Sequence, residues 1–429
     1  MNNRIKVMSL AGLMVVSNLS QSSPISDDYH TGDRLTATML ENIRDAVNDN
    51  DTRISALQTG SINIPVDCST NPDAFRNTPI EDNVTYTLTG MCNGPIRIES
   101  HDNVTIQGDA TGSKDDGVEL QAGLTVQPYA AIGIWQSNGV ILDNLTVSAA
   151  NYVSETYSFG NNVSALHVGI KALAEASNVD FVGGDYSVHV YNDGMLTLRE
   201  GNTVSGFNLG GLTAYNQGLI RTLDDITVSG LAGASTSEDS NAIQAADNAV
   251  IDIRGGGTFA SPTVAGMQDY RTTIWATDNG TVKIRDASNP TQVTGGVASS
   301  RSAVVLIEGN ATVNGYIAAY NTGYTQIAGT TQFGGQLESG DAGYLRFDNS
   351  SLTLSNPLEP TAPIDVYRMG KLRISNSALD LGGNDVSVYN FGMLNLRGST
   401  DLGGADIVCH ERRLIIIQGS VTNIGAIGC

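Results

Sequence analysis

Two histidines with similar surroundings are the first residues of this chain that could carry out chemistry. His189 follows His167 by 22 positions, and Lys171 and Tyr191 lie close to them in the sequence. A β-elimination on a uronic acid needs a base that removes the proton beside the carboxyl group and a cation that holds the carboxylate. His167 and His189 are candidates for the base, and Lys171 for the cation. Because no arginine accompanies them, the interpretation of both histidines as surface bystanders is favoured.

A row of tyrosines is the second candidate site. When the repeated turns described below are aligned, one outward-facing position is tyrosine in five of eight repeats, although only 6% of the chain is aromatic. The row reads Tyr191, Tyr215, Ala246, Thr277, Tyr320, Gly340, Tyr367 and Tyr389, and the neighbouring outward row reads His189, Thr213, Gln244, Trp275, Ala318, Glu338, Asp365 and Ser387.

Such rings can pack on one another and strengthen the sheet, stack on sugars, or form a protomer interface. Packing within the row is the first interpretation, and binding of a glycan or a partner is the second. The residues predicted for binding are Tyr191, Tyr215, Trp275, Tyr320, Tyr367 and Tyr389.

Both candidates depend on a short phrase that the chain repeats: an apolar strand, Asn or Asp, any residue, Gly, and a second apolar strand. Asn and Asp side chains bond their own backbone and Gly accepts a positive φ, so the phrase predicts a tight turn. A period of 20 to 31 residues indicates a solenoid, and alternation with period two indicates short strands. The pattern predicts an all-β, single-stranded parallel β-helix over residues 61–429, with about 16 coils of roughly 23 residues. Copies occur at Asn192/Gly194, Asn216/Gly218, Asp278/Gly280, Asn321/Gly323, Asp341/Gly343 and Asn390/Gly392.

The first coils resemble a known superfamily. The phrases Val66-Asp67-Cys68, Leu88 to Ile98, Asn103 to Gly108 and Asn138 to Val147 are similar to coils of the pectate-lyase-like right-handed parallel β-helix proteins. The resemblance implies a right-handed β-helix. It does not choose a function, because the superfamily includes lyases, hydrolases, adhesins, tailspikes and structural rods. Its hydrolase motifs Asn-Thr-Asp, Gly-Asp-Asp and Gly-His-Gly and its lyase signature Trp-Asp-His do not occur in this chain.

The segment before the solenoid has two predicted parts. Residues 1–22 read as a signal peptide, with Arg4 and Lys6 before a short apolar stretch. Residues 23–60 contain a predicted α-helix at 38–58, which begins with a capping box and carries one apolar stripe at heptad spacing. The helix either caps the first coil or forms a coiled coil, for which a homotrimer is the preferred hypothesis.

Cysteine spacing and charge restrict the compartment and the partners. Cys68 and Cys92, and likewise Cys409 and Cys429, are separated by about one coil, so each pair is predicted to form a disulfide that staples a terminal coil. The formal charge of −21 argues against nucleic acid and anionic membranes as partners. The chain is predicted to be secreted and to lie outside the cell or on its surface, with the periplasm as an alternative. No membrane insertion and no cofactor are expected, although calcium at the acidic turns is an alternative.

These features together predict a non-enzymatic rod that binds a polysaccharide, adheres to surfaces, associates with itself or serves a structural role. The alternative function is a polysaccharide lyase or glycoside hydrolase that acts on an acidic polysaccharide. The two hypotheses predict different distributions of surface charge, because an enzyme for an acidic glycan needs a local cationic groove within this acidic chain.

Overall fold

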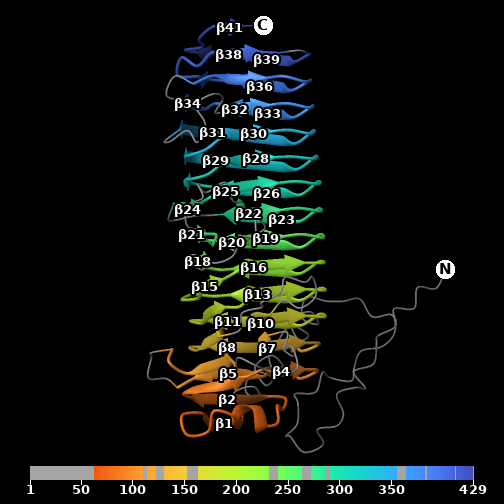
Figure 1. The fold of residues 1–429 in the computed structure, drawn as a ribbon, viewed down its shortest axis with the longest axis vertical. Helices are drawn as coiled ribbons and strands as arrows, with labels where there is room; N and C mark the ends of the chain where they lie inside the picture. The colour runs from red at the N-terminus through yellow and green to blue at the C-terminus, as the bar shows by residue number, and fades with distance from the viewer. Residues whose placement is uncertain are drawn as a thin grey trace, which may run out of the picture. The chain divides into compact units, whose positions relative to one another are not determined.

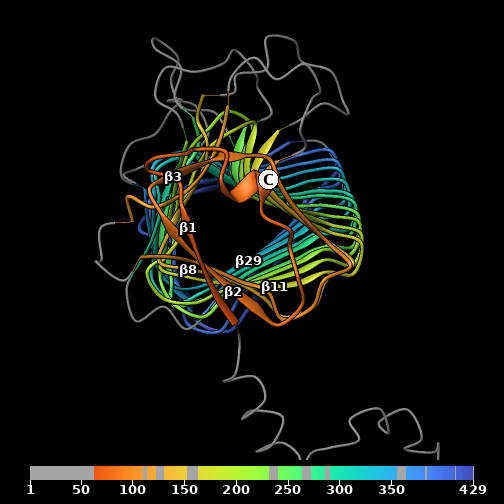
Figure 2. The same ribbon diagram turned by 90° about the horizontal axis from the view of Figure 1, so that it is seen from below.

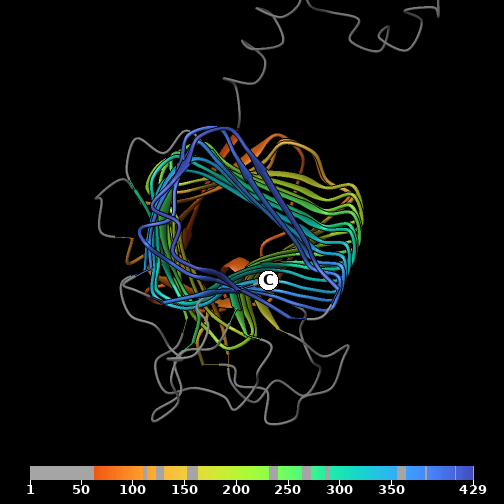
Figure 3. The same ribbon diagram turned by 90° about the horizontal axis from the view of Figure 1, so that it is seen from above.

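A computed structural model describes residues 62–109, 114–121, 130–151, 163–230, 240–262, 272–285, 290–354, 364–381, 384–410 and 412–428. Its strands form a 14-stranded sheet and a 27-stranded sheet. Strands pair in parallel with the equivalent strands of the preceding and following coils, as β10 does with β7 and β13. The result is a parallel β-helix, in which the coils stack along one axis (Figure 1). Seen along that axis, successive coils superpose around a common interior (Figures 2 and 3).

The strands of the 14-stranded sheet are β4 (Ile96–Glu99), β7 (Ala130–Trp135), β10 (Ser164–Gly169), β13 (Tyr186–Tyr191), β16 (Gly210–Tyr215), β19 (Asn241–Ala245), β22 (Thr272–Ala276), β25 (Gly296–Ser299), β28 (Ile317–Ala319), β30 (Leu337–Ser339), β32 (Ile364–Val366), β35 (Val386–Val388), β38 (Ile407–Cys409) and β41 (Ile427–Gly428).

The strands of the 27-stranded sheet are β1 (Ile62–Asp67), β2 (Val84–Thr89), β3 (Met91–Gly94), β5 (Thr105–Gly108), β6 (Gly117–Leu120), β8 (Val140–Asp143), β9 (Thr146–Ala149), β11 (Leu173–Ser177), β12 (Asp180–Gly183), β14 (Met195–Leu198), β15 (Thr203–Phe207), β17 (Leu219–Thr222), β18 (Ile226–Gly230), β20 (Val250–Arg254), β21 (Gly257–Ala260), β23 (Thr281–Arg285), β24 (Thr291–Thr294), β26 (Val304–Glu308), β27 (Ala311–Val313), β29 (Tyr324–Phe333), β31 (Tyr344–Leu354), β33 (Lys371–Ser375), β34 (Ala378–Asp380), β36 (Met393–Arg397), β37 (Thr400–Asp401), β39 (Leu414–Gln418) and β40 (Val421–Thr422). One short 3-10 helix, η2, spans Phe75–Asn77.

The number of coils is close to the sequence estimate of about 16. Among the described residues, the 14-stranded sheet has 14 layers, and the stack of strands from β1 to β39 in the 27-stranded sheet has 15. The coils differ in length, because insertions separate some of the strands. Register partners are 20 residues apart at Ala298 and Ala318 but 36 apart at Ile96 and Ile132.

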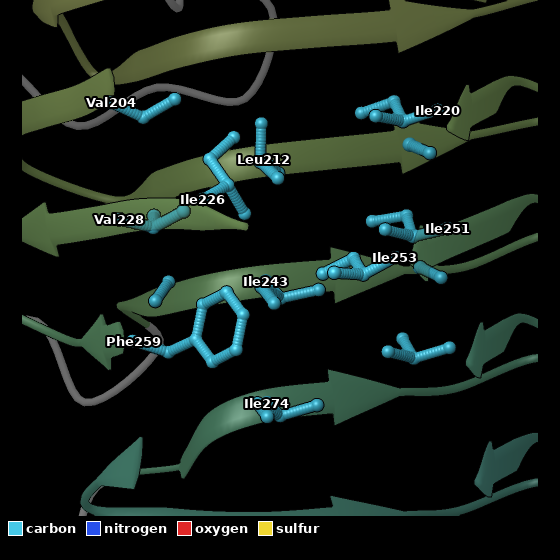
Figure 4. Close-up of a cluster of buried hydrophobic side chains, with 14 of the residues drawn as sticks. Val204, Leu212, Ile220, Ile226, Val228, Ile243, Ile251, Ile253, Phe259 and Ile274 are labelled. Carbon is cyan, nitrogen blue, oxygen red and sulfur yellow. The ribbon is translucent and has the colours of Figure 1, made fainter. Parts of the chain in front are cut away.

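Formation of the core explains which residues of each strand face inward. In β13, Val188 and Val190 are buried while His189 and Tyr191 stay partly exposed. Leu212, Ile243 and Ile274 come from three successive strands and stack in one column inside the coils (Figure 4). Burying each such side chain stabilises the fold by about 1.5–3 kcal/mol relative to leaving it exposed. The continuous core thereby leaves the alternate residues of each strand on the outer face.

The glycine of the repeated turn has a different role from the expected one. Positive φ angles occur at the two residues before it, as at Asn192 (50°) and Asp193 (61°). A Cβ atom on Gly194 would lie 2.6 Å from the carbonyl oxygen of Val168 in the preceding coil. Glycine is therefore favoured there because successive coils approach closely.

Other predictions about the ends of the chain have mixed outcomes. The Cys68–Cys92 disulfide is confirmed. Cys429, the signal peptide at 1–22, and the helix and trimer contact predicted at 38–58 lie outside the described residues. Among the residues that are described, no helix is long and apolar enough to cross a membrane.

Candidate functional site

The outer face of the 14-stranded sheet carries both candidate sites, but the tyrosine row differs from the prediction. β25 lies between β22 and β28, so the aligned rows of repeated turns omit one coil. Its turn reads Arg301-Ser302-Ala303 and thus lacks both the Asn or Asp and the Gly of the repeated phrase. Tyr320 consequently stands one coil farther from Tyr215 than the aligned row implies. The aromatic residues form two separate groups.

The first aromatic group consists of rings that pack on one another. His189 pairs in register with His167, and their ring centroids are 5.1 Å apart. The ring of Tyr191 lies 4.6 Å from His167 and 5.6 Å from His189. The full group is Trp135, His167, Tyr186, His189, Tyr191 and Tyr215.

Burial lowers the pKa values of the two histidines in this group. It lowers the pKa of His167 to about 3, with a further contribution from the neighbouring His189, and it lowers the pKa of His189 to about 4. Both imidazoles are therefore neutral at pH 7. A general base works best when its pKa lies near the working pH. The low pKa values weaken the elimination hypothesis, although the two histidines do lie side by side.

The cation of that hypothesis is placed less favourably. Lys171 is exposed and sits in the turn after β10, where its backbone N–H donates to the carbonyl oxygen of Asn192. The cation beside the rings is Arg97, whose guanidinium carbon lies 5.2 Å from the centre of the Trp135 ring.

The second aromatic group combines tyrosines with two carboxylates. The hydroxyl of Tyr320 donates to one oxygen of Glu338, and the hydroxyl of Tyr367 donates to the other. The Nε2 group of Gln336 donates to Asp365 at 2.6 Å. Asp365 pairs in register with Glu338, so the two carboxylates project from adjacent coils. The full group is Tyr316, Tyr320, Glu338, Asp365, Tyr367 and Tyr389.

Two tyrosines of this group are held as hydrogen-bond donors. Burial and the charge of Glu338 raise the pKa of Tyr320, and burial together with the hydrogen bond to Glu338 raises the pKa of Tyr367. Both phenols remain protonated over the physiological range and fix the orientation of the Glu338 carboxylate. Tyr389 stacks on Tyr367, with centroids 5.5 Å apart and planes 10° from parallel.

Several rings of both groups lie over glycines. A Cβ atom on Gly169 would lie 2.2 Å from Cε1 of Tyr191, and one on Gly340 would lie 2.5 Å from Cζ of Tyr367. Aromatic rings that cover glycine backbone stabilise a sheet. Tyr186 and Tyr316 occupy the same kind of place over Gly210 and Gly296.

Several members of these groups were not predicted as site residues, and one prediction stands apart. Trp135, Tyr186 and Tyr316 were not recognised, although a glycine one coil away from Tyr186 and Tyr316 was a usable signal. Trp275 lies on β22 between Gln244 and Ala298, neither of which is aromatic. It belongs to neither aromatic group.

Cationic side chains gather on the other sheet. Nitrogens of Arg221, Arg254 and Arg285 lie 3.8, 3.5 and 2.6 Å from the carboxylate of Asp252, whose side chain is only 6% exposed. These guanidiniums share one carboxylate, and they are on the 27-stranded sheet, away from the strands that carry the aromatic groups. They do not supply the cationic groove that an enzyme for acidic glycans would need beside the aromatic face.

No set of three His, Cys, Asp or Glu side chains within the described ranges is arranged to hold a metal ion. Calcium at the turns therefore stays an untested hypothesis.

Comparison with known proteins gives no relative for this chain: no protein family, no curated protein and no solved structure matches it.

Proposed function

We propose that this protein is a secreted or cell-surface rod that binds neutral polysaccharides, without cleaving them, along the outer face of its 14-stranded sheet. The observation that carries the proposal is that rings of both aromatic groups lie over glycines on this one face. A ring that covers the backbone with one face can present the other to a sugar. Phenol hydroxyls and carboxylates beside such rings can bond sugar hydroxyls.

Charge selects the class of glycan. Residues 62–365 contain 12 basic and 32 acidic residues, and Glu338 and Asp365 lie within the second aromatic group. An acidic chain repels uronate and sulfate groups unless a local cationic groove opposes the field. Neutral glycans avoid that repulsion.

The location outside the cytoplasm has separate support. Disulfides persist in oxidising compartments and are rare in the cytoplasm, so the Cys68–Cys92 bond favours an exported protein. The apolar stretch near the N-terminus, interpreted as a signal peptide, agrees with export. The resemblance of the first coils to pectate-lyase-like proteins also fits a protein that meets extracellular glycans.

Retention on immobilised polysaccharides tests the proposal. Xylan, mannan and cellulose represent neutral glycans, whereas alginate and polygalacturonate represent acidic ones. We expect retention on at least one neutral glycan, and we expect Tyr191→Ala with Tyr215→Ala, or Tyr367→Ala with Tyr389→Ala, to weaken it about tenfold, since stacked aromatic contacts contribute about 0.5–1.5 kcal/mol each.

The chain offers a matched control for these variants. Tyr324 and Tyr344 form a ring pair with centroids 5.3 Å apart on β29 and β31, which belong to the 27-stranded sheet. Tyr324→Ala with Tyr344→Ala should leave retention unchanged. Equal losses of retention in all three double variants would overturn the assignment of glycan binding to the outer face of the 14-stranded sheet.

A second function, glycoside hydrolysis, is favoured by one observation. Glu338 and Asp365 are register partners on neighbouring strands, which are about 4.8 Å apart in a sheet. Carboxylates about 5–5.5 Å apart are typical of retaining glycosidases. In that mechanism Asp365 protonates the leaving oxygen while Glu338, oriented by two phenols, attacks the anomeric carbon. Asp365 then takes a proton from the water that releases the sugar from Glu338.

Release of reducing ends from the same polysaccharides decides between binding and cleavage. If the pair is catalytic, Glu338→Gln and Asp365→Asn should each lower the rate by at least about a hundredfold while retention persists. If the wild-type protein releases no reducing ends from any of the glycans, hydrolysis is refuted and binding without cleavage remains. Products with the absorbance of unsaturated uronates would instead indicate a lyase.

A further inference from the structure

The repeated turn has two residues with positive φ, and the second of them changes character along the rod. In most coils it is small or polar, as at Asp193, Asn248 and Asn279, whose φ angles are 61°, 64° and 63°. In two adjacent coils near the C-terminus it is Met369 (64°) and then Phe391 (65°). Met369 is 60% exposed and Phe391 is 56% exposed.

These two residues are unfavourable for the isolated protein in two respects. A left-handed backbone conformation is tolerated by Asn and Asp, whose short side chains bond locally, but it is strained for bulkier side chains. Exposure of a large apolar side chain to water gains none of the stabilisation that burial would give. Strain that persists at an exposed position points to a function.

The surroundings of both residues resemble the centre of a protein interface. The turn of Met369 also contains Arg368, which lies 3.6 Å from the carboxylate of Asp341. The turn of the coil after Phe391 contains Arg412, whose guanidinium carbon lies 5.5 Å from the centre of the Phe391 ring. Backbone N–H groups link the two turns to their neighbours, Met369 to the carbonyl of Asn390 and Phe391 to that of Arg412. Phe, Met and Arg are the residues enriched at interface centres. We call Arg368, Met369, Phe391 and Arg412 the C-terminal corner patch.

The distribution of charge along the chain indicates which partner binds the C-terminal corner patch. Residues 366–429 contain 6 basic and 5 acidic residues, in contrast to the strong acidic excess of residues 62–365. Acidic residues also occupy the same turn in earlier coils, at Asp193 and Asp247. Among the described residues, neither of these carboxylates belongs to an ion pair. A second copy of this chain therefore offers a surface of opposite charge.

We propose that the C-terminal corner patch binds the acidic turns of a second copy of this protein, with Met369 and Phe391 at the centre of the contact. An antiparallel pair would place each patch against the Asp193 and Asp247 turns of the other copy, which makes a closed, two-fold dimer. This self-association lies beyond the proposed glycan binding, since it uses turns instead of the face of the 14-stranded sheet.

Sedimentation equilibrium of the full chain over a range of concentrations tests the contact. We expect a reversible dimer that weakens as salt is raised, because opposite surface charges are screened. The variant Met369→Asn with Phe391→Asn should be monomeric. Its melting temperature, compared at a concentration where both proteins are monomeric, should rise by roughly 1–3 °C, since Asn suits this backbone conformation better. A folded, more stable monomer cannot be mistaken for a folding defect.

Leu223→Asn is the matched control. Leu223 is also a large apolar residue and is 40% exposed, but it lies between β17 and β18, outside the repeated turn that carries both the patch and its proposed acidic partners. This variant should dimerise like the wild type. A wild type that stays monomeric, or an assembly that survives the double Asn variant, would overturn the proposal. So would loss of the dimer in Leu223→Asn.

Discussion

The two aromatic groups occupy the same face of one sheet, yet different interactions hold them. In the first group, His167, His189 and Tyr191 pack ring against ring, and burial keeps both imidazoles neutral at pH 7. In the second group, the hydroxyls of Tyr320 and Tyr367 are bonded to the Glu338 carboxylate. The first group therefore depends on the packing of uncharged rings, and the second on directed hydrogen bonds.

This difference shows that the stacking of coils fixes where the outward side chains lie, whereas the identity of the neighbouring side chains determines the chemistry of the site. Register carries each outward residue onto its equivalent in the next coil, about 4.8 Å away. Side chains on two or three adjacent coils then decide whether the place becomes an apolar cluster or a tyrosine–carboxylate network. Tyr191 and Tyr367 illustrate this, because each lies over a glycine but only Tyr367 bonds a carboxylate.

At pH 7, alanine at the glycines beneath the two rings should have the largest effect. Overpacking costs about 1–3 kcal/mol, and we expect Gly340→Ala to cost more than Gly169→Ala. The hydrogen bond to Glu338 restrains the Tyr367 ring, whereas the Tyr191 ring is held by packing against the rings of His167 and His189. Urea unfolding of both variants measures the difference in the free energy of unfolding.

Removal of the ring should rescue the more costly variant. Gly340→Ala combined with Tyr367→Ala should lose less stability than the sum of the two single changes, with a coupling above about 0.5 kcal/mol. Equal losses for Gly169→Ala and Gly340→Ala would contradict the idea that the carboxylate holds one ring in place.

Acid should destabilise the first group through its histidines. The unfolded chain binds protons at an ordinary histidine pKa of 6.5, whereas the folded chain does so only near 3 at His167 and near 4 at His189. Their contribution to stability is present above pH 6.5 and is lost as the pH falls from 6.5 toward 4. The loss is at most about 1.4 kcal/mol per pH unit for each histidine.

Melting temperatures of the wild type and of His167→Gln with His189→Gln, measured between pH 7 and pH 4, check this prediction. Carboxylates elsewhere contribute equally to both proteins, so the difference between the two curves isolates the histidines. A double variant with the same slope as the wild type would show that the imidazoles are protonated in the folded protein.

Loss of one phenol hydroxyl should have the smallest effect and should separate the groups. Tyr320→Phe removes a hydrogen bond to Glu338 and should cost about 1 kcal/mol in the free energy of unfolding. Tyr191→Phe removes a hydroxyl from the ring-packed group and should cost almost nothing. Urea unfolding of the pair provides the measurement, and a larger loss for Tyr191→Phe would show that the first group, too, depends on a hydroxyl hydrogen bond.

Much of the architecture could be read from the chain because it depends on local rules. The repeated turn predicts a parallel solenoid, and period-two alternation predicts that Val188 faces inward and His189 outward. The pairing of Cys68 with Cys92 also follows from a spacing of about one coil. The lengths of the individual coils did not follow, since insertions of different length disturb the period.

The members of the two groups were harder to predict. The turn Arg301-Ser302-Ala303 departs from the repeated phrase, so β25 was missed and the two tyrosine groups looked like one row. The pairing of Glu338 with Asp365 was present in the aligned rows, but its meaning depends on the two phenols that bind Glu338. Those contacts join residues separated by whole coils, which no local pattern describes.

The sequence by itself determined that this chain coils into a parallel β-helix and which side of each strand faces outward, because turn chemistry and alternation act within a few residues. Only the tertiary structure decided which outward side chains meet, since register adds up every insertion along the chain. It also decided their chemistry: burial among neighbouring rings makes His167 a neutral packing residue, and two tyrosines from different coils orient Glu338.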